Sequence, residues 1–156
     1  MRWFYLVLMV CLWGGAGCSP RDDTIAIRWH SGFTPNPVSE QWRASSDGRL
    51  AFIRESAASH HPAAKRQIIR ANVRISPRQF YHLVGVLEPV RKGVLKPQTA
   101  PCGPPDGGSI SVQREGPHGT WRWTSAACDP QRATTMMQAA GEAMVLLRRW
   151  TAQAAQ

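Results

Sequence analysis

Acidic residues are scarce in this sequence. Aspartate and glutamate together number 10 in 156 residues, and the only adjacent pair is Asp22-Asp23. A hydrolase that works with two carboxylates would therefore have to bring distant members of this small set together. The serines occupy no nucleophile elbow, and no glycine-rich run follows a strand and opens a helix, as nucleotide-binding loops do. We expect that the chain is not an enzyme.

Patterns of metal ligands are scarce as well. The most metal-like feature is His60-His61, and a further ligand would have to come from elsewhere, such as Glu55 or His82. Successive residues of an extended chain point in opposite directions, so two adjacent histidines can share one metal only on a bent backbone. No two ligand types recur at the spacing of a zinc site. We expect no metal and no cofactor.

Long apolar runs are absent. The longest is WFYLVLMVCLW, eleven residues at positions 3–13, whereas a membrane-spanning helix needs about 20. Arg2 precedes this run, and the small residues GGAG follow it at positions 14–17. A positive residue, a short apolar run and small residues in this order are typical of a secretory signal peptide. The sequence predicts that residues 1–17 are a signal peptide and no part of the fold.

Cysteine is also rare. Of four cysteines, Cys11 leaves with the signal peptide, and Cys18, Cys102 and Cys128 remain. The stretch GAGC at residues 15–18 resembles the lipobox of bacterial lipoproteins, in which a small residue precedes the cysteine that receives lipid. The resemblance implies that Cys18 is the lipid attachment site, and Cys102 and Cys128 are then left as one pair, which an oxidising periplasm would close as a disulfide. The alternative is cleavage by an ordinary signal peptidase, which would leave Cys18 as a spare thiol.

The same resemblance implies a location. In bacterial lipoproteins an aspartate after the lipidated cysteine usually marks retention in the inner membrane, and here Ser19 stands at that position. The expected address is the outer membrane of a Gram-negative cell, lipid-anchored and facing the periplasm. Two or more acyl chains hold a protein stably on a membrane. Residues 18–23 would form the lipidated N-terminus and tether, and residues 24–156 are long enough for a single domain.

Basic residues are abundant. Lysine and arginine number 19, and removal of Arg2 leaves 18 against 10 acids, a formal net charge of +8. An exported protein does not usually meet nucleic acid, so we expect no nucleic-acid partner. The natural counter-charges are anionic envelope components, namely lipid headgroups, lipopolysaccharide, acidic glycans or an acidic protein. The alternative is a basic surface without a specific partner, since net charge speaks to association and not to fold.

Several segments alternate apolar and polar residues with the period of a β-strand. They are residues 24–30, residues 41–54 as a hairpin, residues 65–76, and residues 109–127 as a second hairpin. Asp47-Gly48 supplies the first hairpin turn and residues 116–119 the second. Residues 31–40 contain glycine and prolines and are expected to form a loop.

Two helices are expected, and a proline stands at the first position of each. Residues 76–79, SPRQ, have the pattern of a capping box, and the helix that follows is expected to stop near Glu88-Pro89. The second helix begins at Pro130 after a capping Asp129, and it carries one apolar stripe. The stripe consists of Met136, Ala140, Ala143, Leu147 and Trp150. The predicted fold is α+β, an antiparallel sheet of about six strands with two helices packed on one face.

Two surfaces are candidates for binding. In the strand at residues 65–76, Arg66, Arg70 and Arg74 share one side, which could bind anions or simply guard a strand edge with charge. Trp121 and Trp123 share a strand face, which could stack on sugars or cover the C-terminal helix as part of the core. The first function that we expect is a non-catalytic periplasmic binding domain of a lipoprotein. The alternative is a protein inhibitor or assembly accessory that acts on an envelope enzyme or complex, as in the small disulfide-bonded envelope lipoproteins that the chain resembles in general plan.

Overall fold

The structure, a computed structural model, describes residues 22–32, 34–59, 61, 64–94, 108–117, 119–125 and 130–153, with side chains of the last segment from residue 134 onward. The predicted lipid site at Cys18 and the predicted disulfide between Cys102 and Cys128 lie outside these residues, as does His60. The anchor and the disulfide therefore stay predictions. Among the described residues, no helix is long and apolar enough to cross a membrane.

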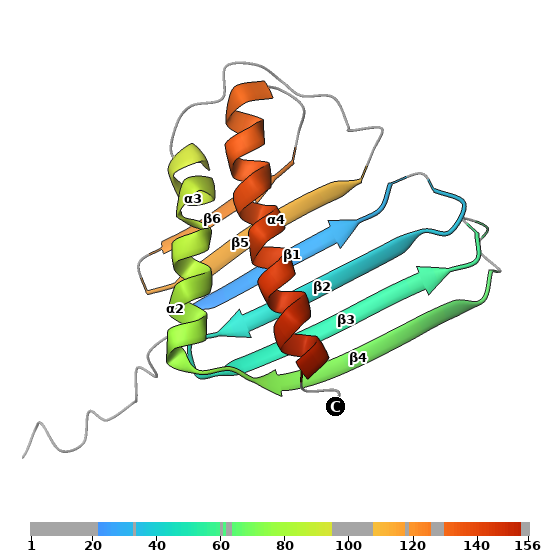
Figure 1. Cartoon of the computed structure of the whole chain (residues 1–156), viewed down its shortest axis with the longest axis horizontal. Coiled ribbons are helices and arrows are strands. Elements are labelled where there is room, and N and C mark those ends of the chain that lie inside the picture. Colours follow the sequence, from blue (N-terminus) through green and yellow to red (C-terminus); the bar gives the residue numbers. More distant parts are fainter. Residues whose placement is uncertain are drawn as a thin grey trace, which may run out of the picture.

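Six strands form one sheet in which every neighbouring pair is antiparallel (Figure 1). The strands are β1 (Thr24–His30), β2 (Val38–Ser45), β3 (Arg49–Ala57), β4 (Arg66–Arg74), β5 (Ser109–Gly116) and β6 (Gly119–Thr124). Their order across the sheet is β4-β3-β2-β1-β5-β6. The α+β class and the six antiparallel strands are confirmed.

The three helices within the described residues lie on one face of the sheet (Figure 1). They are α2 (Pro77–Val86), α3 (Glu88–Val94) and α4 (Pro130–Gln153). The expectation of two helices is wrong by one. The helix that begins at Pro77 does stop where predicted, but α3 begins at Glu88 directly after it. Pro89 has no N–H with which to continue α2, whereas the first turn of a new helix needs none.

The core lies between this sheet face and the helices. Every residue of the predicted α4 stripe is buried, so that prediction is confirmed. From the sheet and the other helices the largest fully buried side chains are Trp42, Phe80, Ile25, Ile27, Leu50, Leu83, Leu87, Val90 and Val112. The alternation of β1 is also confirmed, since Ile25 and Ile27 are buried and Trp29 packs against the same core. The sheet thus has one covered face.

Two local signals are confirmed in detail. The N–H of Gln79 donates to the Ser76 hydroxyl at 3.2 Å, and the N–H of Ser76 donates to the Gln79 side chain at 2.8 Å, which completes the capping box. Between β2 and β3, Gly48 has a φ of +87°, a conformation that a residue with a Cβ rarely adopts. A Cβ at Gly48 would also lie 2.8 Å from the carbonyl oxygen of Ile75. The hairpin turn therefore requires glycine there.

The loop predicted for residues 31–40 is too long. β2 begins at Val38 and includes Glu40, which is buried on the helix side although it is charged. A charged residue at an inward position hides the alternation that marks a strand. Glu40 is accommodated there because two arginines contact it, and no local pattern reveals these partners.

The strand β4 is an edge strand. The alternation predicted for residues 65–76 holds where the strand ends, since Val73 is partly covered and Ile75, the residue after β4, is buried. At its middle, Ile69 remains 47% exposed although it points to the helix side. An edge strand has a neighbour on one side only, so the predicted inward side chains are incompletely covered.

Candidate anion-binding face

Side-chain alternation sorts the residues of the sheet onto two faces. Ile25, Trp42 and Leu50 belong to the helix-covered face, and the residues between them in each strand point to the opposite face. No helix of the described residues packs on this second face, because all three lie on the other side (Figure 1). We call it the open face.

The open face is rich in arginine. Seven arginines, all exposed, stand at its strand positions: Arg28 on β1, Arg43 on β2, Arg49 on β3, Arg66, Arg70 and Arg74 on β4, and Arg122 on β6. The strand positions of this face carry two acids, Glu55 and Glu115. The strands therefore give this face an excess of five positive charges.

The three arginines predicted from the sequence lie together on β4. Arg66, Arg70 and Arg74 are four residues apart on one straight strand, so consecutive ones are about 13 Å apart. All three are exposed, and among the described residues none has a carboxylate oxygen within 4.0 Å. Their guanidinium groups are open to an anionic ligand. That they bind one stays a prediction.

The sheet brings a fourth arginine beside this row. Arg49 of β3 stands directly opposite Arg74 in the register. The N–H of Ile75 donates to the carbonyl oxygen of Gly48 at 2.9 Å, so the next pair, Arg49 and Arg74, is of the non-hydrogen-bonded kind, in which side chains are closest. Like charges directly opposite are unfavourable. The Asp47 carboxylate, whose Oδ2 lies 3.0 Å from Nε of Arg49, partly offsets this repulsion.

The remaining arginines of the open face extend the positive surface across the sheet. Arg70, Ile53, Gln41 and Arg28 are successive cross-strand partners in one row, so Arg70 and Arg28 lie three strand spacings apart, about 14 Å. Arg43 and Arg122 occupy the next row. The alternation of each strand could have placed these arginines on an outward side, but only the strand order shows that the outward sides form one face.

A hollow of about 970 Å³ lies over one end of the open face, where β1 and β3 begin. The charged residues that line it are Arg43, Arg49, Arg74, Asp22, Asp47 and Glu115. Three arginines and three acids balance each other there. The other arginines of the open face, Arg28, Arg66, Arg70 and Arg122, are accompanied by one acid of its strands, Glu55, so the net positive charge of the face lies with them.

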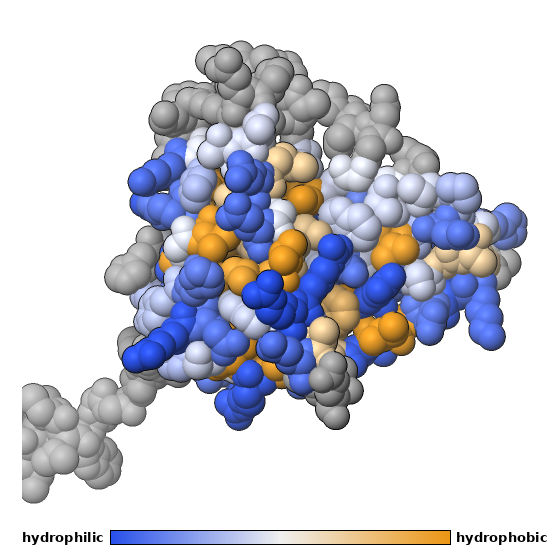
Figure 2. Space-filling view, in the orientation of Figure 1, coloured by the Kyte–Doolittle hydropathy of each residue, from blue (hydrophilic) through white to orange (hydrophobic). Residues whose placement is uncertain are grey.

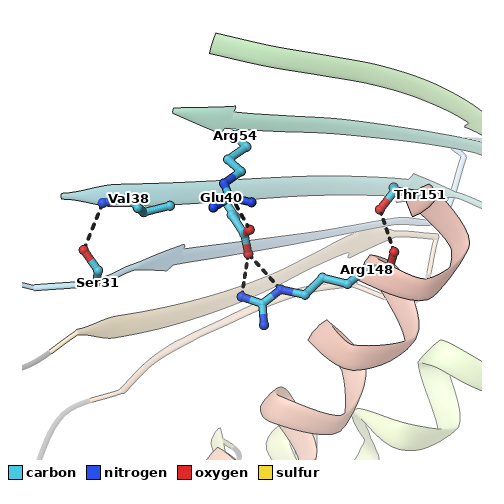
Figure 3. A network of polar contacts seen from close by, with 6 residues as sticks. All are labelled: Ser31, Val38, Glu40, Arg54, Arg148 and Thr151. Carbon is cyan, nitrogen blue, oxygen red and sulfur yellow. Dashed lines mark hydrogen bonds and ion pairs between the residues drawn. The ribbon is translucent and has the colours of Figure 1, made fainter. Parts of the chain in front are cut away.

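A polar cluster on the covered face was not predicted (Figure 3). The Glu40 side chain, 6% exposed, accepts hydrogen bonds from Nε and Nη2 of Arg148 at 2.9 and 2.6 Å. Arg54 approaches the same carboxylate from the other side at 3.8 Å. The guanidinium of Arg148 also lies 5.5 Å from the ring centre of Trp29 and 5.8 Å from that of Trp42. The cluster fastens the C-terminal half of α4 to the sheet.

A second ion pair fastens the beginning of the fold. Arg114 of β5 donates from Nε and Nη2 to the two carboxylate oxygens of Asp23 at 2.9 and 2.5 Å. This hydrogen bonding raises the pKa of Arg114, and partial burial opposes the effect. The N–H of Asp23 also donates to the Ser46 hydroxyl. Asp23, which the sequence assigns to the predicted tether, thus contacts the domain.

The structure gives no site at the other residues that the sequence singled out, within the part of the chain that it describes. His61 and His82 are both exposed, and within the part of the chain that the structure describes, no group of three or more histidine, cysteine or acidic residues could hold a metal. Trp121 and Trp123 lie on the covered face and belong to the core, so they form no platform for sugars. The core alternative placed them under the C-terminal helix, but the helix that β6 contacts most is α3.

No family model matches the chain, and no curated protein matches its sequence. The open face is therefore interpreted from its own chemistry.

Proposed function

We propose that the chain is an outer-membrane lipoprotein, anchored through lipid on Cys18, whose periplasmic domain binds an anionic envelope component on its open face without catalysing a reaction. The observation that carries this proposal is the set of seven exposed arginines on a sheet face with two acids. Arginine suits the role because its planar guanidinium donates two parallel hydrogen bonds to a phosphate or carboxylate.

The docked Asp23 makes the membrane surface the favoured partner. Asp23 is fixed to Arg114 and Ser46, and only five residue steps separate it from Cys18. An extended chain covers at most about 3.6 Å per residue, so the domain would lie within roughly 18 Å of the lipid. Anionic headgroups attract basic residues over about one Debye length, roughly 8 Å at physiological ionic strength. A short tether of this length supports contact between the open face and the headgroups.

Vesicle binding tests this proposal. The mature chain with Cys18→Ser, which has no anchor, should sediment with phosphatidylglycerol vesicles at low ionic strength and not with phosphatidylcholine vesicles. A basic residue near an anionic surface contributes about 1 kcal/mol, so Arg66→Gln, Arg70→Gln and Arg74→Gln together should weaken binding up to about 100-fold.

A matched control removes the same charge from the helix side. Arg78, Lys92 and Arg149 are all exposed on the helices, and their triple replacement by glutamine should weaken binding far less. Equal losses in the two triple variants would show that only net charge matters, and the open face would lose its assigned role.

Intact mass tests the anchor and the disulfide. The native protein from envelopes should have the mass of residues 18–156 plus three acyl chains and a glycerol unit, and reduction should add two hydrogens as the Cys102-Cys128 bond opens. Cys18→Ala should move the protein out of the membrane fraction. A native protein without the lipid increment, or a Cys18→Ala variant that still sediments with membranes, contradicts the anchor.

A second candidate function is docking on another envelope protein, as an inhibitor or an assembly accessory. The observation that favours it is the edge of β4, which pairs with β3 alone among the described residues. Crosslinking in cells separates the two functions, since a single protein adduct favours docking and lipid adducts favour the membrane surface.

A further inference from the structure

The strand β4 has one unpaired edge within the described part of the chain. It is nine residues long, and each of its residues from Arg66 to Arg74 has a single partner on β3. The register therefore contains no bulge, and the strand contains no proline. Proteins prevent another strand from adding to an edge with bulges, prolines, very short strands or charged side chains. β4 has none of the first three, and its exposed arginines repel a basic strand but attract an acidic one.

The direction of the free backbone groups follows from one hydrogen bond. The N–H of Ile75 donates to Gly48, the residue opposite it on the β3 side, at 2.9 Å. In an antiparallel ladder, residues alternately point both backbone groups toward the neighbour and away from it. Val73, Ala71 and Ile69 therefore point their backbone groups toward β3. The residues whose N–H and C=O point outward are Arg66, Ile68, Arg70, Asn72 and Arg74.

The two faces of this edge differ in chemistry. On the open face the edge presents the three exposed arginines. On the helix side Ile69, 47% exposed, and Ala71 border a hollow of about 630 Å³ between β4 and the C-terminal part of α4. Trp29 and Phe52 contribute apolar surface to the same hollow. Figure 2, which views the helix side, shows apolar side chains exposed among hydrophilic ones beside α4.

Charge argues against a second copy of this chain as the occupant. If two copies pair antiparallel through β4 with their helices on the same side, both rows of arginines lie on one face along the joint. Six arginines would gather there, and like charges across neighbouring strands are destabilising. An acidic strand would instead be attracted by the same row.

We propose that the edge of β4 accepts an extended segment of a partner protein as a seventh strand. Side chains of a strand alternate between faces, so acidic residues of the partner face Arg66, Arg70 and Arg74 while apolar residues pack over Ile69 and Ala71. Backbone hydrogen bonds give such a strand its affinity, and the alternating side chains give specificity. This inference does not need the lipid anchor, but it shares three arginines with the proposed headgroup contact.

The probe is a nine-residue peptide of alternating valine and glutamate with blocked ends, measured by fluorescence anisotropy against the mature Cys18→Ser chain. The control peptide has the same composition with its glutamates grouped together. The decisive variant is Asn72→Pro, which removes an outward N–H but keeps every charge and every bond to β3. Proline is tolerated on an edge strand where its N–H would face solvent. Ile68→Pro makes the same change elsewhere on the edge, should the first variant fold poorly.

We expect the alternating peptide to bind the parent chain at least tenfold more tightly than it binds either proline variant. We also expect the control peptide to bind the parent chain at least tenfold more weakly than the alternating peptide does. In the parent chain it should slow hydrogen exchange at the five outward amides named above. Proline variants that bind the alternating peptide as well as the parent chain, or equal binding of the two peptides, would overturn the proposal. If the free chain self-associates and Asn72→Pro abolishes this self-association, the edge binds a second copy of the chain, and the proposal is overturned as well.

The two proposals fail separately. Asn72→Pro keeps all arginines, so it should bind phosphatidylglycerol vesicles like the parent chain while losing the peptide. Loss of vesicle binding by the Arg66, Arg70 and Arg74 triple variant tests the headgroup contact. The peptide binding of the same variant tests strand addition at the edge of β4. If the parent chain binds the peptide but does not bind the vesicles, strand addition is supported and the headgroup contact is refuted.

Discussion

Replacement of Arg148 by alanine tests how α4 is held on the sheet. Arg148 donates two hydrogen bonds to a Glu40 carboxylate that is 6% exposed. After the change, Arg54 at 3.8 Å is the one remaining cation near that carboxylate among the described residues. A buried charge deprived of its hydrogen-bonding partner destabilises the fold, because water cannot replace the lost donors.

The magnitude follows from burial. Removing one partner of a fully buried ion pair costs about 3 to 5 kcal/mol of unfolding free energy. Arg148 is 46% exposed and Arg54 offers partial compensation, so we expect the lower end, about 3 kcal/mol, which includes the lost contacts with Trp29 and Trp42. Glu40→Gln keeps the shape and leaves Arg148 access to water, so it should cost less, about 1 to 2 kcal/mol.

Urea unfolding of the four members of a double-mutant cycle is the assay. The coupling energy between Arg148→Ala and Glu40→Gln should be about 1 to 2 kcal/mol, because the residues are in direct contact. Arg149→Ala, one position along on the exposed side of α4, should change stability by less than about 0.5 kcal/mol. If Arg148→Ala and Arg149→Ala lower the free energy of unfolding equally, or the coupling energy is zero, the ion pair does not hold α4 on the sheet and the reasoning is wrong.

Three further predictions concern the fold. Gly48→Ala should destabilise by about 2 kcal/mol or more in thermal or urea unfolding, since it forces a left-handed backbone on alanine and presses a Cβ against the Ile75 carbonyl oxygen. Leu147→Ala empties a site that is 1% exposed and should cost about 3 kcal/mol in the same assay; a loss below 1 kcal/mol would place Leu147 outside the core. Hydrogen bonding to Arg91 lowers the pKa of Glu88, so carboxyl NMR should show Glu88 titrating below an ordinary glutamate, and Arg91→Gln should return it toward the usual range. Glu88 therefore stabilises the folded chain fully at pH values above the glutamate pKa of the unfolded chain, about 4.3. This stabilisation is lost as the pH falls through the lower pKa that Glu88 has in the folded chain.

Local elements were largely predictable because their signals are local. The Ser76 capping box, the Asp47-Gly48 turn and the α4 stripe each depend on residues within a few positions of one another, and each is present as predicted. The start of β2 was missed because Glu40 breaks the apolar pattern, and its partner Arg148 is 108 residues away. α3 was missed because Pro89 ends one helix and fits the start of another equally well.

The candidate site was only partly predictable. The row on β4 follows from alternation within one strand, which places Arg66, Arg70 and Arg74 on one side. The addition of Arg49 follows from the pairing of β3 with β4. Arg28 joins the same face through the pairing of β1 with β2 and of β2 with β3. Arg122 joins it because the β5-β6 hairpin pairs with β1 through β5, and the sequence contains no mark of that pairing.

The sequence by itself determined the inward apolar residues of β1 and α4, the approximate positions of most strands, and the starts of α2 and α4. It also carries the prediction of a signal peptide and a lipid site at residues 1–18. The tertiary structure alone decided the strand order, the position of β4 at an edge and the gathering of arginines on an uncovered face. The physical reason is that alternation specifies the side of a strand but not its neighbour. The neighbour is chosen by the burial of apolar surface and by pairing between distant segments, such as β1 with β5.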